Sequence, residues 1–297
     1  MIQRIFIGIL LFLAGCARQE APASALRLVS TAPHLTEALC AIGAGDLLVG
    51  RTDACDYPTE RLQKIPAVGG FGTPSLESLL EQRPTHLVET ILAKPDIKST
   101  LEPVGISVVH VPIRLLADIP PALRQLGELT GHTREATRLA ETIQRGIREA
   151  QGKQSLSKTA PRVFLLLTPD TPMTLGKSTF VSELLELAGG VNVGRESLAD
   201  YYHVSLEWLL EKDPDLILCL YETYGQDPCH LLKEQIGWKA LSAVRHQRVY
   251  TLPDLNSACR PGPRVLEGLG QFKTVLARDA QEAQRAGIKA DERNLKD

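Results

Sequence analysis

The sequence lacks the cysteine spacing that a zinc or redox centre requires. Its 297 residues contain six cysteines but no C-x-x-C pair, so neither a zinc ribbon nor a thioredoxin-type centre is indicated. Cys40 and Cys219 lie in apolar segments, where cysteine is expected to be a small buried residue. One disulfide would be compatible with an oxidising compartment, but the spacing does not select its partners among Cys40, Cys55, Cys219, Cys229 and Cys259.

An excess of charge of one sign and the familiar catalytic motifs are also missing. The formal net charge of −2 provides no general field for nucleic acid or anionic lipid. Residues 176–179 (GKST) resemble the end of a phosphate-binding loop, but position 171 is threonine instead of the glycine that this loop needs. Neither H-E-x-x-H nor G-x-S-x-G occurs. No particular enzymatic chemistry is indicated, so partners must be sought in local sites.

A long apolar run is found only at the start of the chain. Arg4 precedes the apolar residues 5–13, and the segment LAGC ends at Cys16. The run is about half of the roughly 20 residues that a membrane-spanning helix needs, which predicts a signal peptide over residues 1–15. LAGC resembles the lipobox of bacterial lipoproteins, which implies that Cys16 is lipidated and that residues 16–25 tether an exported protein to a membrane. The alternative is an ordinary signal with an incidental cysteine.

The rest of the chain alternates strand-like and helical segments in two halves. Runs such as LRLVS (26–30) and THLVET (85–90) alternate with amphipathic helical patterns, which predicts α/β folding with parallel sheets. Residues 118–156 interrupt this alternation with apolar residues at helical spacing, so we expect one long helix there, with room for a shorter one before it. The predicted order is an N-terminal lobe (26–117), a connecting helical region (118–156), a C-terminal lobe (157–290) and a polar tail (291–297).

One segment occurs twice. Residues 75–88 (SLESLLEQRPTHLV) and 205–218 (SLEWLLEKDPDLIL) are identical at seven of fourteen positions, which indicates an internal duplication. In each copy a serine can cap a helix that ends before a proline, and a strand follows. The two lobes are therefore expected to carry equivalent helices.

These segments, in this order, resemble one known family. STAPHLTEALCAIGAG, the two repeated segments, MTLGKSTFVSELLELAGGVNV and RPGPRVLEGL are similar to the periplasmic substrate-binding proteins of ABC importers for cobalamin, siderophores and haem, and most of all to the cobalamin branch. The similarity covers about residues 26–275. It implies two Rossmann-like lobes joined by one long rigid helix, with a ligand in the cleft between them and no catalysis.

The resemblance gives a role to the glutamate in each repeated segment. Glu77 and Glu207 match residues that meet arginines on the two identical membrane subunits of the importer. Carboxylate–guanidinium contacts are strong and directional, and a stiff connector would keep the two acids at a fixed separation. Taken singly, each glutamate would only complement the positive end of its helix. Glu81 and Glu211, one turn later, are expected to be solvated.

The ligand site is expected beyond the carboxyl ends of the strands, as in other open parallel sheets. Aromatic residues make up only 5% of the chain, yet several lie in the loops at these ends and could face a large flat macrocycle. The predicted loops cover residues 31–34, 53–57, 71 and 90–92 in the first lobe, and 169–173, 201–203, 221–224 and 256–260 in the second. Tyr57 and Tyr201 are among the predicted ligand contacts.

The resemblance also matches single positions. Phe71 and Tyr202 stand where cobalamin-binding relatives have tryptophan, and Met173 stands where they have phenylalanine. Ala54 replaces a usual tyrosine and Ile91 replaces a further tryptophan, so the exact ligand stays open between a corrinoid and haem.

Four polar residues have open roles. His203 and Cys55 are candidate axial ligands for cobalt or iron, with ordinary polar lining as the alternative. His34 is expected to order the first loop. Arg260 could bind a carboxylate or amide edge of the ligand, or form a salt bridge to a neighbouring loop.

Together these features predict a lipid-anchored, monomeric substrate-binding protein without a cofactor of its own. It would capture a corrinoid, with cobalamin as the first choice, and deliver it to the permease dimer of an ABC importer. A haem or ferric-siderophore binding protein of the same family is the alternative, although an anionic siderophore would need a cluster of arginines and the predicted cleft loops contain few. A lipoprotein enzyme or chelatase acting on such cofactors, or a sensor module, would be a different class.

Overall fold

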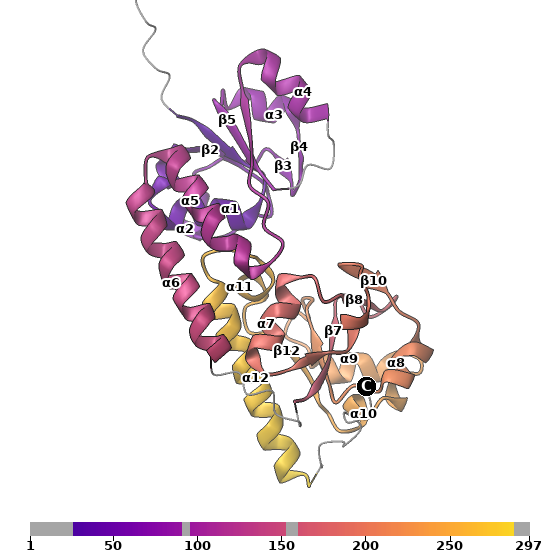
Figure 1. The fold of residues 1–297 in the computed structure, drawn as a ribbon. Helices are drawn as coiled ribbons and strands as arrows, with labels where there is room; N and C mark the ends of the chain where they lie inside the picture. The colour runs from indigo at the N-terminus through magenta and orange to yellow at the C-terminus, as the bar shows by residue number, and fades with distance from the viewer. Residues whose placement is uncertain (1–25, 91–95, 153–159, 288–297) are drawn as a thin grey trace, which may run out of the picture.

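The computed structural model describes residues 26–90, 96–152 and 160–287 and arranges them as two α/β lobes, one above the other (Figure 1). The predicted signal peptide, Cys16, the tether, Ile91 and the polar tail lie outside these ranges. None of the helices in the described ranges has the length and apolar character that a membrane crossing demands.

The N-terminal lobe is built on a four-stranded parallel sheet in the order β2-β1-β5-β6. Its strands are β1 (Leu28–Ser30), β2 (Leu48–Arg51), β5 (His86–Glu89) and β6 (Ser107–His110). The helices of this lobe are α1 (Pro33–Ala41), α2 (Thr59–Leu62), α3 (Leu76–Glu81) and α4 (Asp96–Leu101), and a small antiparallel pair is formed by β3 (Gly69–Gly70) and β4 (Thr73–Pro74).

The C-terminal lobe repeats this plan with a parallel sheet in the order β12-β11-β7-β9. Its strands are β7 (Arg162–Leu166), β9 (Val191–Asn192), β11 (Leu216–Cys219) and β12 (Val249–Thr251), and β8 (Met173–Leu175) pairs antiparallel with β10 (Tyr201–His203). The helices are α7 (Phe180–Ala188), α8 (Leu206–Lys212), α9 (Pro228–Glu234), α10 (Ser242–Arg245), α11 (Leu255–Cys259) and α12 (Val265–Arg285). Short 3-10 helices cover Ala44–Leu47, Glu102–Val104, Leu116–Asp118, Val193–Glu196 and Trp238–Ala240.

A long helix joins the lobes. Residues 118–156 form α5 (Ile119–Thr130) and the 20-residue α6 (Thr133–Gly152). Gly131 separates the two helices because it adopts a left-handed φ of 74°, which glycine tolerates and which ends a helix. On the left of the molecule in Figure 1, α6 packs against α7 and α12. The expectation of two Rossmann-like lobes joined by a long rigid helix is confirmed.

Both faces of each sheet are covered, as the alternation of side chains along the strands shows. In β5, Leu87 and Val88 are both fully buried but belong to different hydrophobic clusters. In β7, Phe164 and Leu165 are divided in the same way. Because successive side chains of a strand point to opposite faces, the continuous apolar runs of these strands place each sheet between two layers of helices.

One of the clusters is shared by both lobes. It runs from Leu28 in β1, through α5 and α6, to Phe272 in α12 and the sheet of the C-terminal lobe. The outer faces of the two sheets have their own clusters, in which Leu79 of α3 and Leu209 of α8 take part. The repeated segments therefore occupy equivalent places in the two lobes, away from the shared core.

Candidate functional site

A cavity of about 740 Å³ lies between the lobes and is lined by both of them. We call it the cleft. All four strands of the N-terminal sheet lead into it, because its lining includes residues at or just after their carboxyl ends: His34, Ala54, Thr90, His110 and 112–114. The C-terminal lobe contributes residues 178–180, Asp200, Tyr201 and residues 259–261. The cleft thus lies where parallel α/β sheets bind ligands.

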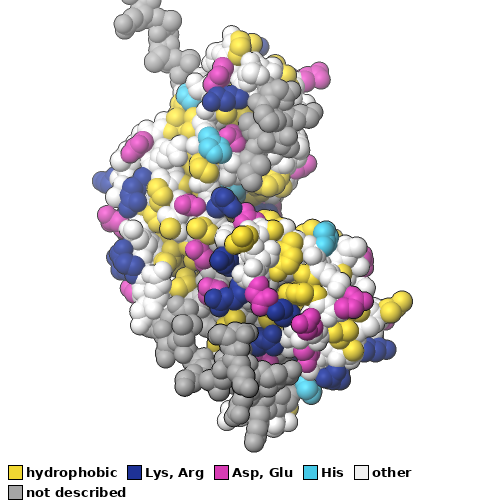
Figure 2. All heavy atoms as spheres, turned by 45° about the vertical axis from the view of Figure 1, so that its right-hand side comes forward, with side chains coloured by type: hydrophobic (Ala, Val, Ile, Leu, Met, Phe, Trp, Pro, Cys, Tyr) yellow, Lys and Arg dark blue, Asp and Glu magenta, His cyan; other side chains and the backbone are white. Residues whose placement is uncertain are grey.

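Two aromatic side chains meet the cleft from opposite lobes. Phe71 lies in the turn between β3 and β4 and is 49% exposed, and Tyr201 begins β10 and is 56% exposed. Large hydrophobic side chains with such exposure are candidates for a binding surface. Figure 2 shows hydrophobic side chains on both sides of the waist between the lobes. The cleft therefore offers apolar faces to a flat ligand.

Both arginines of the cleft are paired with acids of the protein. Arg260 contacts Glu37 and Asp56 of the other lobe, and Arg114 Nη2 lies 2.6 Å from Asp200 Oδ2 across the cleft. Burial opposes the charge of Arg260, but Asp56 and Glu37 outweigh it and raise the pKa of its guanidinium. Neither arginine is left over for an anionic ligand unless one of these pairs opens.

A buried ion-pair cluster stands behind Arg260 and joins the lobes. Glu37 is 3% exposed and accepts hydrogen bonds from Arg264 at 2.8 and 3.0 Å and from Arg260 at 3.2 Å. Arg264 also contacts Asp254 Oδ2 at 2.7 Å, and its guanidinium stacks 4.1 Å above the ring centre of Tyr57. We call these residues the inter-lobe clamp. Tyr57, a predicted ligand contact, is thus stacked on Arg264 and is not among the residues that line the cleft.

Comparison with known proteins agrees with this architecture. Residues 28–255 match the family model described as periplasmic binding protein.

This chain belongs to the periplasmic binding protein family. It is 32% identical over 256 residues to the vitamin B12-binding protein of Pectobacterium atrosepticum, covering 84% of this chain and 88% of that protein. It is similar to the crystal structure of the periplasmic vitamin B12 binding protein BtuF of Vibrio cholerae, with a TM-score of 0.71, 26% identity and coverage of 86% and 98%. The apo form of the periplasmic haem-binding protein RhuT from Roseiflexus sp. RS-1 gives a TM-score of 0.73, 25% identity and coverage of 86% and 100%.

In this periplasmic binding protein, Ala54, Phe71, Tyr201 and Arg260 are the predicted contacts that line the cleft. Other predicted contacts lie elsewhere. Tyr202 is half-buried and donates a hydrogen bond from its hydroxyl to the backbone oxygen of Gly194 at 2.8 Å. Met173 pairs with His203 in the β8–β10 ladder, and neither is among the residues that line the cleft. The alternation of β10 explains why neighbouring Tyr201 and Tyr202 differ, since their side chains point to opposite faces.

The two candidate axial ligands also lie apart from the cleft lining. Cys55 is 3% exposed, and its Sγ lies 3.2 Å from the hydroxyls of both Thr36 and Thr52. His203 is exposed, and its Nδ1 lies 3.2 Å from the backbone oxygen of Thr171. All five cysteines in the described ranges are free thiols.

Two groups of the cleft wall, the buried His34 and the half-buried Cys259, have strongly shifted pKa values. Burial, helped by the nearby Arg260, lowers the pKa of His34 from 6.5 to about 4, so its ring is neutral at physiological pH. Its Nε2 is enclosed and has no hydrogen-bond partner in the described part of the protein. Burial raises the pKa of the Cys259 thiol to about 12. The sequence predicts that His34 orders the first loop, but this role does not provide a hydrogen-bond partner for Nε2 of His34.

The sequence analysis missed one side of the cleft. His110 ends β6 and residues 112–114 follow it, while residues 178–180 lead into α7. Residues 106–111 (ISVVHV) have the apolar pattern of a strand, so the rule that places ligands at the carboxyl ends of strands also covers the loop after them. Residues 178–180 carry no comparable signal, because they enter the cleft through contact between the lobes, as in the hydrogen bond from Phe180 N to Arg114 O.

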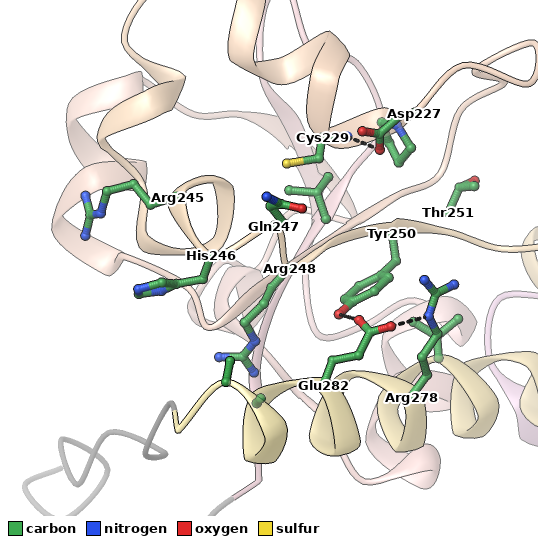
Figure 3. A pocket seen from close by; sticks show the side chains of 15 residues that line it. Asp227, Cys229, Arg245, His246, Gln247, Arg248, Tyr250, Thr251, Arg278 and Glu282 are labelled. Atoms are coloured by element: carbon green, nitrogen blue, oxygen red, sulfur yellow. Dashed lines mark hydrogen bonds and ion pairs between the residues drawn. The ribbon is translucent and has the colours of Figure 1, made fainter.

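A second cavity, of about 750 Å³, lies in the C-terminal lobe and is shown in Figure 3. It is bordered by Arg248, Tyr250 and Thr251 of the β12 region and by Arg278 and Glu282 of α12. Its charged groups satisfy one another, since Glu282 accepts hydrogen bonds from Tyr250 at 2.9 Å and from Arg278 at 2.8 Å. This cavity is lined by the C-terminal lobe alone, and no strand of the N-terminal sheet ends at it. The inter-lobe cleft is therefore the better candidate site.

The two predicted docking glutamates occupy matching positions on the surface. Glu77 and Glu207 are exposed residues in the first turns of α3 and α8. Ser75 and Ser205 cap the helices by accepting hydrogen bonds from backbone N–H groups three residues on, at 3.3 and 3.1 Å. The backbone N–H of Glu207 and the hydroxyl of Ser205 hold the pKa of the Glu207 carboxyl below its ordinary value. In Figure 1, α3 and α8 both lie to the right of α6.

Proposed function

We propose that this protein captures a corrinoid, with cobalamin as the expected ligand, in the inter-lobe cleft and delivers it to an ABC importer. The observation that carries the proposal is the composition of the cleft. Phe71 and Tyr201 offer apolar faces from opposite lobes, while Arg114 and Arg260 are already paired with acids. A corrin ring has a broad flat face and neutral amide groups at its edge, which suit such a lining.

The competing ligands would be recognised by different chemistry. Haem carries two carboxylates and many siderophores are anionic, so they would require free cations, for which arginine is the usual residue. The relatives support the same order of preference, because the 32% identical protein is named as vitamin B12-binding. The family consists of substrate-binding proteins, and we propose no reaction.

Binding measurements on the mature protein test this proposal. Calorimetry with cyanocobalamin, haemin and a ferric hydroxamate should give the tightest binding with cyanocobalamin. Phe71→Ala and Tyr201→Ala should each weaken that binding about 30- to 150-fold, because a half-exposed ring that buries about 100 Å² contributes roughly 2–3 kcal/mol. Tyr224→Ala is the matched control, since Tyr224 is 88% exposed and does not line the cleft. Haemin binding that exceeds cyanocobalamin binding would instead assign the haem alternative.

Delivery is proposed to depend on Glu77 and Glu207. The two glutamates occupy equivalent positions on the N-terminal lobe (26–117) and the C-terminal lobe (157–290), which residues 118–156 join. They would therefore present two equivalent carboxylates to the two identical membrane subunits of the importer. Glu77→Lys combined with Glu207→Lys should reduce uptake by at least tenfold and leave ligand affinity unchanged. Glu81→Lys combined with Glu211→Lys is the matched control, because these exposed acids lie one turn later on the same helices. Uptake that survives the first pair would remove the docking assignment.

Anchoring is proposed to depend on Cys16, which lies outside the described residues. Cys16→Ser should release the exported protein from the membrane fraction, and mass spectrometry should find acyl groups on the wild-type N-terminal peptide. A protein that remains membrane-bound after the substitution, or carries no acyl group, would contradict the lipid anchor.

A further inference from the structure

A carboxylate and an imidazole form a close pair at the edge of the cleft. Glu89 ends β5 and His110 ends β6, and the two residues are direct neighbours in the parallel ladder. Nδ1 of His110 lies 2.6 Å from Oε1 of Glu89. The imidazole side chain is 58% exposed, whereas the carboxylate side chain is 7% exposed. The pair therefore joins a buried acid to a ring that faces outward.

This pair is not explained by stability. A buried carboxylate is costly unless its oxygens are satisfied, and Oε2 of Glu89 has no hydrogen-bond partner in the described part of the chain. The exposed ring of His110 returns one hydrogen bond to one oxygen. What the pair does achieve is orientation, because Nδ1 is engaged by the carboxylate and Nε2 is the nitrogen left for another partner.

The same arrangement is found behind imidazoles that bind metals. A ligating histidine commonly donates its second ring N–H to a carboxylate, which fixes the tautomer and the orientation and raises the basicity of the ligating nitrogen. His110 lines the cleft together with Phe71 and Tyr201, so its ring borders the space that the cargo would fill.

Neither His34 nor His203 offers this arrangement. His34 also lines the cleft, but its Nε2 is enclosed by protein. His203 is not among the lining residues, and its Nδ1 faces the backbone oxygen of Thr171. Only His110, among the described residues of the cleft lining, combines an exposed ring with a carboxylate behind it.

The surroundings also specify what kind of metal could be bound. No group of three or more His, Cys, Asp or Glu side chains in residues 26–90, 96–152 and 160–287 could hold a metal ion. One imidazole cannot retain a bare cation against water, but it suffices for a metal that already has four in-plane donors. Such a metal is found at the centre of a tetrapyrrole-like macrocycle.

We propose that His110, oriented by Glu89, is an axial ligand to the metal of a macrocyclic cargo in the cleft. This inference rests on the proposed function and gives His110 the axial role for which the sequence offers His203 and Cys55 as candidates. The bond forms from Nε2 to the metal and displaces a weakly held water. A cargo whose two axial positions are firmly occupied, such as cyanocobalamin, would bind without it.

The test uses probes with open axial positions. Diaquocobinamide and haemin are titrated into the mature protein while their visible absorption is recorded, and cyanocobalamin affinity is measured by calorimetry. Wild-type protein should shift the absorption bands of diaquocobinamide, and of haemin if haemin enters the cleft. His110→Ala should abolish the shift. Glu89→Gln should keep the shift but weaken the binding of diaquocobinamide about 10- to 100-fold, and His203→Ala should behave as wild type.

The outcomes separate this proposal from the proposed function. Normal cyanocobalamin binding without any shift of diaquocobinamide, or with a shift that persists in His110→Ala, overturns the axial assignment and leaves the function standing. A shift abolished by His203→Ala would move the role to that residue and also overturn the assignment. Failure to bind any of the three macrocycles overturns both proposals.

Discussion

The inter-lobe clamp makes a quantitative prediction about Glu37. Its carboxylate is 3% exposed and receives three hydrogen bonds from Arg260 and Arg264. Removing one partner of a buried ion pair typically costs about 3–5 kcal/mol, because the other charge is left uncompensated. Arg260 keeps Asp56, and Arg264 keeps Asp254, so we expect Glu37→Gln to lower the free energy of unfolding by about 3 kcal/mol, at the lower end of that range.

Urea unfolding followed by circular dichroism measures this change, and heating should show a melting temperature lower by about 6–12 °C. Glu102→Gln is the matched control. Its partner Lys98 lies 3.7 Å away, and both side chains are more than half exposed, so its loss should cost less than about 1 kcal/mol. If Glu37→Gln costs no more than Glu102→Gln, the ion pairs do not hold the lobes together and the clamp must be abandoned.

Three further predictions concern His34, the helix caps and Cys259. The pKa of His34 is about 4 in the folded protein and near 6.5 when unfolded, so the unfolded chain binds more protons between these values. The free energy of unfolding should therefore fall as pH drops from 6.5 to 4, by at most about 1.4 kcal/mol per pH unit from this residue, and His34→Gln should flatten that part of a urea-midpoint profile; an unchanged profile would contradict the assigned pKa. Ser75→Ala and Ser205→Ala should each cost about 1 kcal/mol in the same assay through loss of an N-cap, and a cost confined to one lobe would show that the two helices are not equivalent. Because burial raises the pKa of Cys259 to about 12, iodoacetamide at pH 8 should alkylate it much more slowly in the native protein than in urea, as peptide mass spectrometry would report; equal rates would mean that the thiol is accessible.

The architecture could be predicted from the sequence because it depends on local patterns. The repeated segments predicted α3 and α8 and their serine caps. This was possible because the capping serine, the apolar face and the following proline together define the start, the buried side and the end of a single helix. The long helical region gave α6, although the separation of α5 at Gly131 depends on a left-handed residue that periodicity does not reveal. Strand order was outside the prediction, because pairing is decided by contacts between distant segments.

The cleft was predicted only in part, for a related reason. Phe71 and Tyr201 lie in loops that follow from the positions of the strands, and they do line the cavity. The choice between Tyr201 and Tyr202 depends on the register of the short β8–β10 ladder, which shifts every side chain to the other face if it moves by one residue. The pairing of Arg260 with Glu37 joins residues 223 positions apart, and no spacing rule in the sequence connects them.

The position of α12 in the chain has a consequence for the order of assembly. Arg264 immediately precedes α12 and binds Glu37, a residue 227 positions earlier, while α12 itself packs on α6 and α7. Contacts between such distant segments form late because a large loop must close first. A nascent polypeptide that emerges amino end first can therefore fold its first half early, but it has no finished binding groove until its final segment arrives. The order of the chain therefore places completion of the cleft after synthesis of its C-terminal segment.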